Sequence, residues 1–292
     1  MSHTVHVIGA GGRSGAALVR ALAAQGVPVQ PVVRDLGRWH AAGIPPAVVI
    51  APPRMADLQD EQAMRAALRD ATRIVSTAHA RHTAALLAAA PPAARLVLLG
   101  STRRFTRWPD AHGEGVRGGE AALLGSGRAG VMLHPTMIYG ATGENNVRRL
   151  AALLRRVPVV PLPGGGRALV QPVHQDDVTR AILAALAIDW DGPHAIVIAG
   201  PVPLAYADFV RAVARAAGLG RPRIVPLPAA PLMALAPLTA LLPGLPRVTP
   251  AEIRRLTEDK AFDIGPMSAT LGVTPVPLQA GLDLTFRRRG VF

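Results

Sequence analysis

Three glycines near the N-terminus have a spacing suited to holding a phosphate. Gly9, Gly12 and Gly15 lie in the stretch GAGGRSG, after an apolar strand-like segment over 4–9 and before an apolar helix-like segment over 14–25. In such a unit the first glycine permits a tight turn, the second lets the backbone approach a pyrophosphate, and the third lets helix and strand pack closely. The helix N-terminus adds N–H donors and a favourable dipole. The sequence therefore predicts a dinucleotide site; a tight turn without a ligand is the alternative. Gly11, Arg13 and Ser14 of the same turn are further candidate cofactor-binding residues.

The residues after the next predicted strand, 27–33, favour one form of the dinucleotide. An acid at this point binds the ribose 2′-OH of NAD, whereas an arginine accommodates the 2′-phosphate of NADP. Here the strand is followed by Arg34 and Asp35. Arg34, assisted by Arg13 or Arg38, could pair with a 2′-phosphate, so we expect NADP(H). Asp35 stands one residue late for the acid role and keeps NAD(H) open, and a solvated charge at a helix start is the alternative reading of Arg34.

Short apolar segments alternate with helix-like segments along the first half of the chain. This alternation predicts an α/β fold with a Rossmann-type, doubly wound parallel sheet, buried on both faces. We expect a nucleotide-binding core over 1–140 and a smaller C-terminal substrate lobe over 141–292, with a segment at about 168–198 returning to the core. The strands are expected over 4–9, 27–33, 48–51, 73–77, 96–100 and 131–133, and the helices of this half over 14–25, 60–68, 83–90 and around 119–124.

Composition excludes several classes of protein. The net charge is +13, but aromatic residues are only 3%, too few for a surface that stacks on bases, and we expect no nucleic acid as a partner. The charge instead favours a small anionic substrate. The absence of cysteine excludes disulfides and thiolate chemistry.

His79 and His82 have no nearby third ligand, so no metal is expected. Without a signal-like or membrane-spanning segment, we expect a cytoplasmic protein.

Several segments occur in the order typical of one superfamily. They are 56–58 (ADL), 98–102 (LLGST), 134–140 (HPTMIYG), 171–178 (QPVHQDDV) and 200–209 (GPVPLAYADF). On these segments and the glycine turn, the chain resembles the short-chain dehydrogenase/reductase superfamily over essentially its whole length. The resemblance is to the extended or atypical branch, which includes NAD(P)-dependent epimerases and dehydratases and NmrA-like proteins.

The resemblance implies further site residues. Asp57 and Leu58 stand where the family contacts the adenine, and Ser101 and Thr102 stand where it has a catalytic serine or threonine; a cap at the strand end is the alternative for these two hydroxyls. The remaining implied cofactor positions lie after the fourth and sixth strands, at Thr77, Ala78, His79, Pro135 and Thr136.

One departure from the superfamily concerns its catalytic Tyr-x-x-x-Lys motif. The chain has two tyrosines, Tyr139 and Tyr206, neither followed four residues later by lysine, and its sole lysine is Lys260. Counting back from Glu120 places His112 at the tyrosine position. An imidazole transfers protons near neutral pH, so His112 is a candidate acid/base, with an exposed loop histidine as the alternative. Tyr139 is a second candidate, with packing or lining of the cofactor pocket as the alternative.

The resemblance leaves two functions open. The first is an NAD(P)-dependent oxidoreductase or epimerase/dehydratase-like protein that transfers hydride at a carbinol or carbonyl carbon of a nucleotide sugar or another anionic or lipid-linked substrate. The second, favoured by the missing motif, is a non-catalytic NADP(H)-binding sensor or structural accessory subunit. Either function is compatible with a homodimer. The apolar segment 229–242 is too short and too interrupted by proline to span a bilayer, but it could contact a membrane surface or a partner subunit.

Overall fold

The computed structural model describes residues 4–140, 146–157, 159–241 and 248–287, and the chain forms two compact units. Unit 1 comprises Met1–Pro135, Gln175–Ile198 and Ile264–Thr274, and unit 2 comprises the rest. The first continuous segment of unit 1 ends at Pro135. The chain returns to unit 1 twice, and the second return, at 264–274, had no signal in the sequence.

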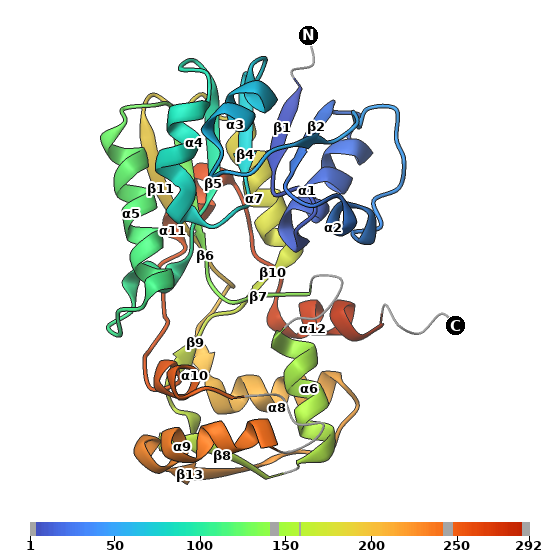
Figure 1. The fold of residues 1–292 in the computed structure, drawn as a ribbon. Helices are drawn as coiled ribbons and strands as arrows, with labels where there is room; N and C mark the ends of the chain where they lie inside the picture. The colour runs from blue at the N-terminus through green and yellow to red at the C-terminus, as the bar shows by residue number, and fades with distance from the viewer. Residues whose placement is uncertain (1–3, 141–145, 158, 242–247, 288–292) are drawn as a thin grey trace. The chain divides into compact units, whose positions relative to one another are not determined.

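Unit 1 is built on a parallel sheet of seven strands in the order β11-β6-β5-β4-β1-β2-β3 (Figure 1). The predicted doubly wound sheet is confirmed. The strands β1, β2, β4, β5 and β6 are apolar and mostly buried, as expected for a sheet covered on both faces. The bounds are β1 Val5–Ile8, β2 Val29–Val33, β3 Arg54–Met55, β4 Arg73–Ser76, β5 Arg95–Leu99, β6 Gly130–Pro135 and β11 Pro193–Ile198.

Helices cover both faces of this sheet. The helices α1 (Arg13–Ala24) and α7 (Gln175–Ala187) pack together on one face, while α3 (Glu61–Leu68), α4 (Thr83–Ala89) and α5 (Ala111–Gly125) form a second layer (Figure 1). Strand order reverses between β1 and β4, and in such sheets ligands bind beyond the carboxyl ends of the strands at this point. The unit also contains α2 (Leu36–Ala41), α11 (Gly265–Leu271) and the short 3₁₀ turns η1 (Ala80–His82) and η2 (Thr102–Phe105).

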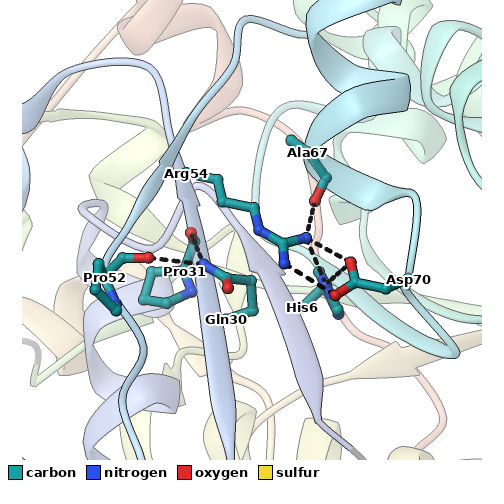
Figure 2. A network of polar contacts seen from close by, with 7 residues as sticks. All are labelled: His6, Gln30, Pro31, Pro52, Arg54, Ala67 and Asp70. Atoms are coloured by element: carbon teal, nitrogen blue, oxygen red, sulfur yellow. Dashed lines mark hydrogen bonds and ion pairs between the residues drawn. The ribbon is translucent and has the colours of Figure 1, made fainter.

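The third strand lies later in the chain than predicted. The segment 48–51 contributes only an isolated bridge between Ile50 and Val29, and the strand that pairs with β2 is β3. Three polar side chains, those of Arg54, Asp70 and His6, connect this edge of the sheet to its neighbours (Figure 2). The Arg54 guanidinium pairs with the Asp70 carboxylate and donates to the Ala67 carbonyl at 2.8 Å. An oxygen of the Asp70 carboxylate also lies 3.3 Å from Nε2 of the buried His6 in β1. Asp70, which follows α3, therefore contacts residues of both β1 and β3.

Unit 2 combines short strand pairs with helices. Its core surrounds Val147, Phe209, Val213 and Leu282. The strand pairs are β7 (Ile138–Tyr139) with β10 (Val173–His174), β9 (Leu169–Val170) with β12 (Leu204–Ala205), and β8 (Val159–Pro163) with β13 (Arg223–Leu227). The helices are α6 (Asn146–Arg156), α8 (Tyr206–Ala216), α9 (Ala229–Leu235), α10 (Pro250–Arg255) and α12 (Leu278–Arg287), with 3₁₀ turns η3 (Gly164–Gly166) and η4 (Ala236–Leu241).

Candidate functional site

The glycine turn joins β1 to α1 in a conformation that needs glycine. Gly9 has a positive φ of 76°, and the Gly12 N–H donates to the Gly9 carbonyl at 2.9 Å. A Cβ atom on Gly15 would lie 2.2 Å from that same carbonyl oxygen. The Thr77 hydroxyl donates to the Ile8 and Gly9 carbonyls, at 3.1 and 3.2 Å. Thr77 therefore fixes the turn to the end of β4.

The first turn of α1 is open to an anion. Gly12 caps the helix without a side-chain hydrogen bond, and both Gly12 and Arg13 are exposed. The early N–H groups of a helix have no partner within it, and they carry its positive end. The Ser14 hydroxyl donates to Gln175 at 3.0 Å, which ties α1 to α7. The residues present thus fit a pyrophosphate, held by backbone N–H groups and Arg13.

The carboxyl end of β2 presents a cation. Arg34 has a side chain 68% exposed, with its guanidinium 3.7 Å from the Asp57 carboxylate. Asp35 caps α2 by accepting the Arg38 N–H at 3.1 Å. The carboxylate that could bind a ribose hydroxyl is therefore engaged in the helix start, while Arg34 extends into solvent. Gly11 lies against the Trp39 backbone, where a Cβ would come within 3.1 Å, and Leu58 packs on the core below.

Two histidines meet beyond the end of β4. The rings of His79 and His112 are T-shaped with centroids 4.2 Å apart, although 33 positions separate them in the sequence. The Nδ1 atom of His79 accepts the Arg81 N–H at 3.0 Å, so its proton lies on Nε2. Burial, followed by the charges of His112 and Arg81, lowers the pKa of His79 to about 4. The ring is therefore neutral at pH 7. Ala78 precedes this pair and is half-buried.

Ser101 and Thr102 follow β5. The Ser101 hydroxyl oxygen accepts the Arg103 N–H at 3.2 Å, which leaves its O–H able to donate. The Thr102 hydroxyl donates to the Pro135 carbonyl at 3.3 Å, at the end of β6. Both hydroxyls thus act as strand-end caps, and Ser101 retains a donor for a ligand.

The backbone of Ser101 is held by a buried histidine, His134. His134 accepts the Ser101 N–H on Nδ1 and faces Glu120 at 3.1 Å through Nε2, and Arg104 pairs with the same carboxylate. Glu120 and His134 are 5% and 1% exposed. The sequence predicted no role for His134, and Glu120 served only to locate His112. The one signal available was that both polar residues fall among apolar neighbours.

The two predicted site residues that lie in unit 2, Thr136 and Tyr139, are both buried. The Thr136 hydroxyl donates to the Gln171 carbonyl. Tyr139 is completely buried, with its ring 5.2 Å from that of His174 in a T-shaped contact. A Cβ on Gly281 would lie 2.2 Å from the Tyr139 hydroxyl. This placement favours packing for Tyr139 over the catalytic role that we considered from the sequence.

Among the residues that the structure describes, no three His, Asp or Glu side chains are grouped to hold a metal ion. Within the same ranges, no helix has the length and hydropathy needed to cross a bilayer.

Comparisons with known proteins bear on the fold. No family model and no curated protein matches the sequence. Solved structures do match over nearly the whole chain. MoeE5 in complex with UDP-glucose and NAD is 19% identical with a TM-score of 0.71, covering 98% of this chain and 99% of that one. UDP-glucuronic acid 4-epimerase from Bacillus cereus, in complex with UDP-glucuronic acid and NAD, is 16% identical with a TM-score of 0.73, covering 99% and 100%.

A third match is an Escherichia coli NADPH-dependent quinone oxidoreductase, QOR2, complexed with NADPH. It is 18% identical with a TM-score of 0.73, and the match covers 97% of this chain and 99% of that one. These likenesses confirm the predicted Rossmann-type α/β fold over nearly the whole chain.

Proposed function

We propose that this protein binds NADP(H) at the glycine turn and transfers hydride to or from a carbonyl or carbinol carbon of an anionic small molecule. The observation that carries the proposal is the exposed start of α1, which has no side-chain cap and directly follows a turn closed by the Gly12–Gly9 hydrogen bond. That arrangement is a ready site for a pyrophosphate.

The preference for NADP(H) rests on Arg34. Its guanidinium is exposed at the end of β2, where a 2′-phosphate would lie in a Rossmann site, and the neighbouring Asp35 is engaged as a helix cap. Among the solved structures of the same fold, QOR2 is an NADPH complex, while MoeE5 and the Bacillus cereus epimerase are NAD complexes. The fold is therefore compatible with either dinucleotide, and the local charge favours NADP(H).

Ser101 and His112 are the groups that we propose act on the substrate. Nicotinamide, when bound, supplies the hydride chemistry; the protein must orient the reacting oxygen and move its proton. Ser101 has an O–H free to donate to that oxygen. His112 stands in the first turn of α5 against the neutral ring of His79 and would exchange the proton. The charges of Arg81 and Arg103 both act on His79, but the Arg103 guanidinium pairs with the Asp110 carboxylate, so Arg81 is the cation that would attract an anionic substrate.

A second function, an NADP(H)-binding sensor without turnover, is favoured by the state of the tyrosines and the lysine. Tyr139 is completely buried, and burial raises the pKa of Tyr206 to about 12. The ammonium group of Lys260 donates to the carbonyls of Arg255 and Glu258. Neither tyrosine lies in a setting that would favour a phenolate, so the exchange of the substrate's proton would depend on His112.

The test is whether bound NADPH is oxidised. Purified protein saturated with NADPH is mixed with a panel of UDP-sugars, quinones and acidic ketones, and the fluorescence of the reduced nicotinamide is followed. Oxidation that depends on one class of acceptor, and that falls in His112→Ala, supports the hydride-transfer proposal. NADPH binding without oxidation by any acceptor supports the sensor. Failure to bind NADPH or NADH contradicts both.

A further inference from the structure

An apolar segment of unit 2 is left exposed by the fold. Residues 229–241 of α9 and η4 read AAPLMALAPLTAL and contain no charged side chain. No residue of α9 is buried, and Leu235 and Leu238 are 58% and 52% exposed. These two leucines are three positions apart and therefore lie on one side of the helical segment. Residue 242, the end of the apolar segment predicted from the sequence, lies outside the described residues.

The other side of this segment is attached to unit 2. The helix α9 packs against α10 and β8, and Ala236 of η4 is buried. The one polar side chain, Thr239, donates to the Ala236 carbonyl and accepts the Val248 N–H at 2.9 Å. The hydroxyl is thus used within the fold, and what the segment presents outward is aliphatic.

The surroundings of the segment are basic. No acidic residue occurs between Asp208 and Glu252. Arg221 and Arg223 are exposed on and beside β13, the strand that leads into α9, and Arg254 is exposed on α10. The Glu252 carboxylate of α10 accepts hydrogen bonds from the backbone and hydroxyl of Thr249, at 2.8 and 3.0 Å, and also pairs with Arg149. Its negative charge is therefore already engaged.

We propose that this face of unit 2, formed by α9 and η4 with the basic residues of β13 and α10, docks on the surface of an anionic membrane. A short apolar helix lies in the plane of the lipid interface, and arginines at its rim are attracted to acidic headgroups. A symmetric contact with a second copy would bring the same basic rims together, so the charges oppose it. This proposal is independent of the proposed hydride transfer.

Vesicle flotation of the full-length protein tests the proposal. The vesicles contain phosphatidylcholine alone, or phosphatidylcholine with about one third phosphatidylglycerol. We expect binding to the acidic vesicles, weakened by high salt because the arginine attraction is screened. Leu235→Glu should lower that binding by about tenfold or more, since it removes an inserted leucine and adds a repelled charge. The double change Arg221→Gln with Arg223→Gln should lower it by about tenfold.

The matched control is Leu124→Glu, on α5 of unit 1, where the leucine is 44% exposed. It should bind vesicles as the unchanged protein does, and NADPH titration of each variant checks that unit 1 stays folded. Absence of binding to acidic vesicles would overturn the proposal, as would equal binding by Leu235→Glu. Concentration-dependent dimers that Leu235→Glu abolishes, without vesicle binding, would assign the face to a second copy instead.

Discussion

The Nδ1 atom of His134 accepts the backbone N–H of Ser101 at 3.1 Å, just past the end of β5. This bond fixes the tautomer of His134, so the proton lies on Nε2, the atom that is 3.1 Å from the Glu120 carboxylate. Burial, followed by the charge of Arg104, lowers the pKa of His134 to about 4. The neutral ring therefore holds the backbone of a proposed substrate-binding residue, and protonation on Nδ1 would break the bond.

We predict that stability falls as the pH drops from 6.5 to 4. The folded pKa of His134 is about 4 against 6.5 for an ordinary histidine, so the unfolded chain binds the proton first. The stabilisation that His134 contributes is complete above pH 6.5 and is lost as pH falls, with a slope of up to about 1.4 kcal/mol per pH unit. His79, whose pKa is also about 4, adds a slope of the same sign. Urea unfolding across this range measures it.

The change His134→Asn should reduce this slope, because asparagine offers an acceptor to Ser101 without titrating. Burial raises the pKa of the neighbouring Glu120, so the contribution of Glu120 to stability increases as the pH falls, opposite to that of His134. The control Glu120→Gln should therefore keep the histidine-dependent slope. An unchanged slope in His134→Asn would leave His79 as its source and would contradict the contribution assigned to His134.

Gly12→Ala should weaken NADPH binding without unfolding the protein. Gly12 has a φ of −79°, which alanine adopts, and its Cβ would meet the Gly9 carbonyl oxygen at 3.1 Å. The added methyl group would stand where the pyrophosphate approaches, and we expect a loss of about tenfold or more in affinity. The control is Gly118→Ala in α5, where a Cβ meets nothing within 4 Å. It should stabilise the protein by about 0.5–1 kcal/mol and leave NADPH binding unchanged.

Arg34→Gln should lower the affinity for NADPH by about tenfold to a hundredfold, because a charge-assisted hydrogen bond to the 2′-phosphate is lost. Affinity for NADH should stay the same. Isothermal calorimetry with both dinucleotides measures the difference. Arg65→Gln, an exposed arginine of α3 paired with Glu61, is the matched control and should alter neither affinity. An equal loss for both dinucleotides would show that Arg34 does not contact the 2′-phosphate.

His112→Ala should lower the rate of NADPH oxidation by about a hundredfold or more while leaving NADPH affinity unchanged, since proton transfer contributes that much to such reactions. His194→Ala is the control, because His194 is partly exposed near the amino end of β11 and pairs with Asp191. Stopped-flow measurement at saturating NADPH separates the rate from binding. Full activity in His112→Ala would remove that histidine from the mechanism.

The fold was predictable because its signals are local. A buried strand, the glycine turn and an apolar helix are each readable from a few neighbouring residues. The contacts that shape the site are not local. The rings of His79 and His112 are in contact because η1, which follows β4 in the chain, packs against α5. Tyr139 is buried by Gly281, a residue of the distant α12, so the sequence left its catalytic and packing roles open. The strand expected at 48–51 failed because it was assigned from apolarity alone.

The most direct test of the account is a calorimetric titration of nucleotide-free protein with NADPH and, separately, with NADH. The exposed start of α1 and the exposed Arg34 predict binding of both, with NADPH the tighter ligand by about tenfold or more. Tighter binding of NADH would indicate that Asp35, and not Arg34, contacts the adenosine ribose. Binding of neither would contradict the central claim that the glycine turn holds a dinucleotide.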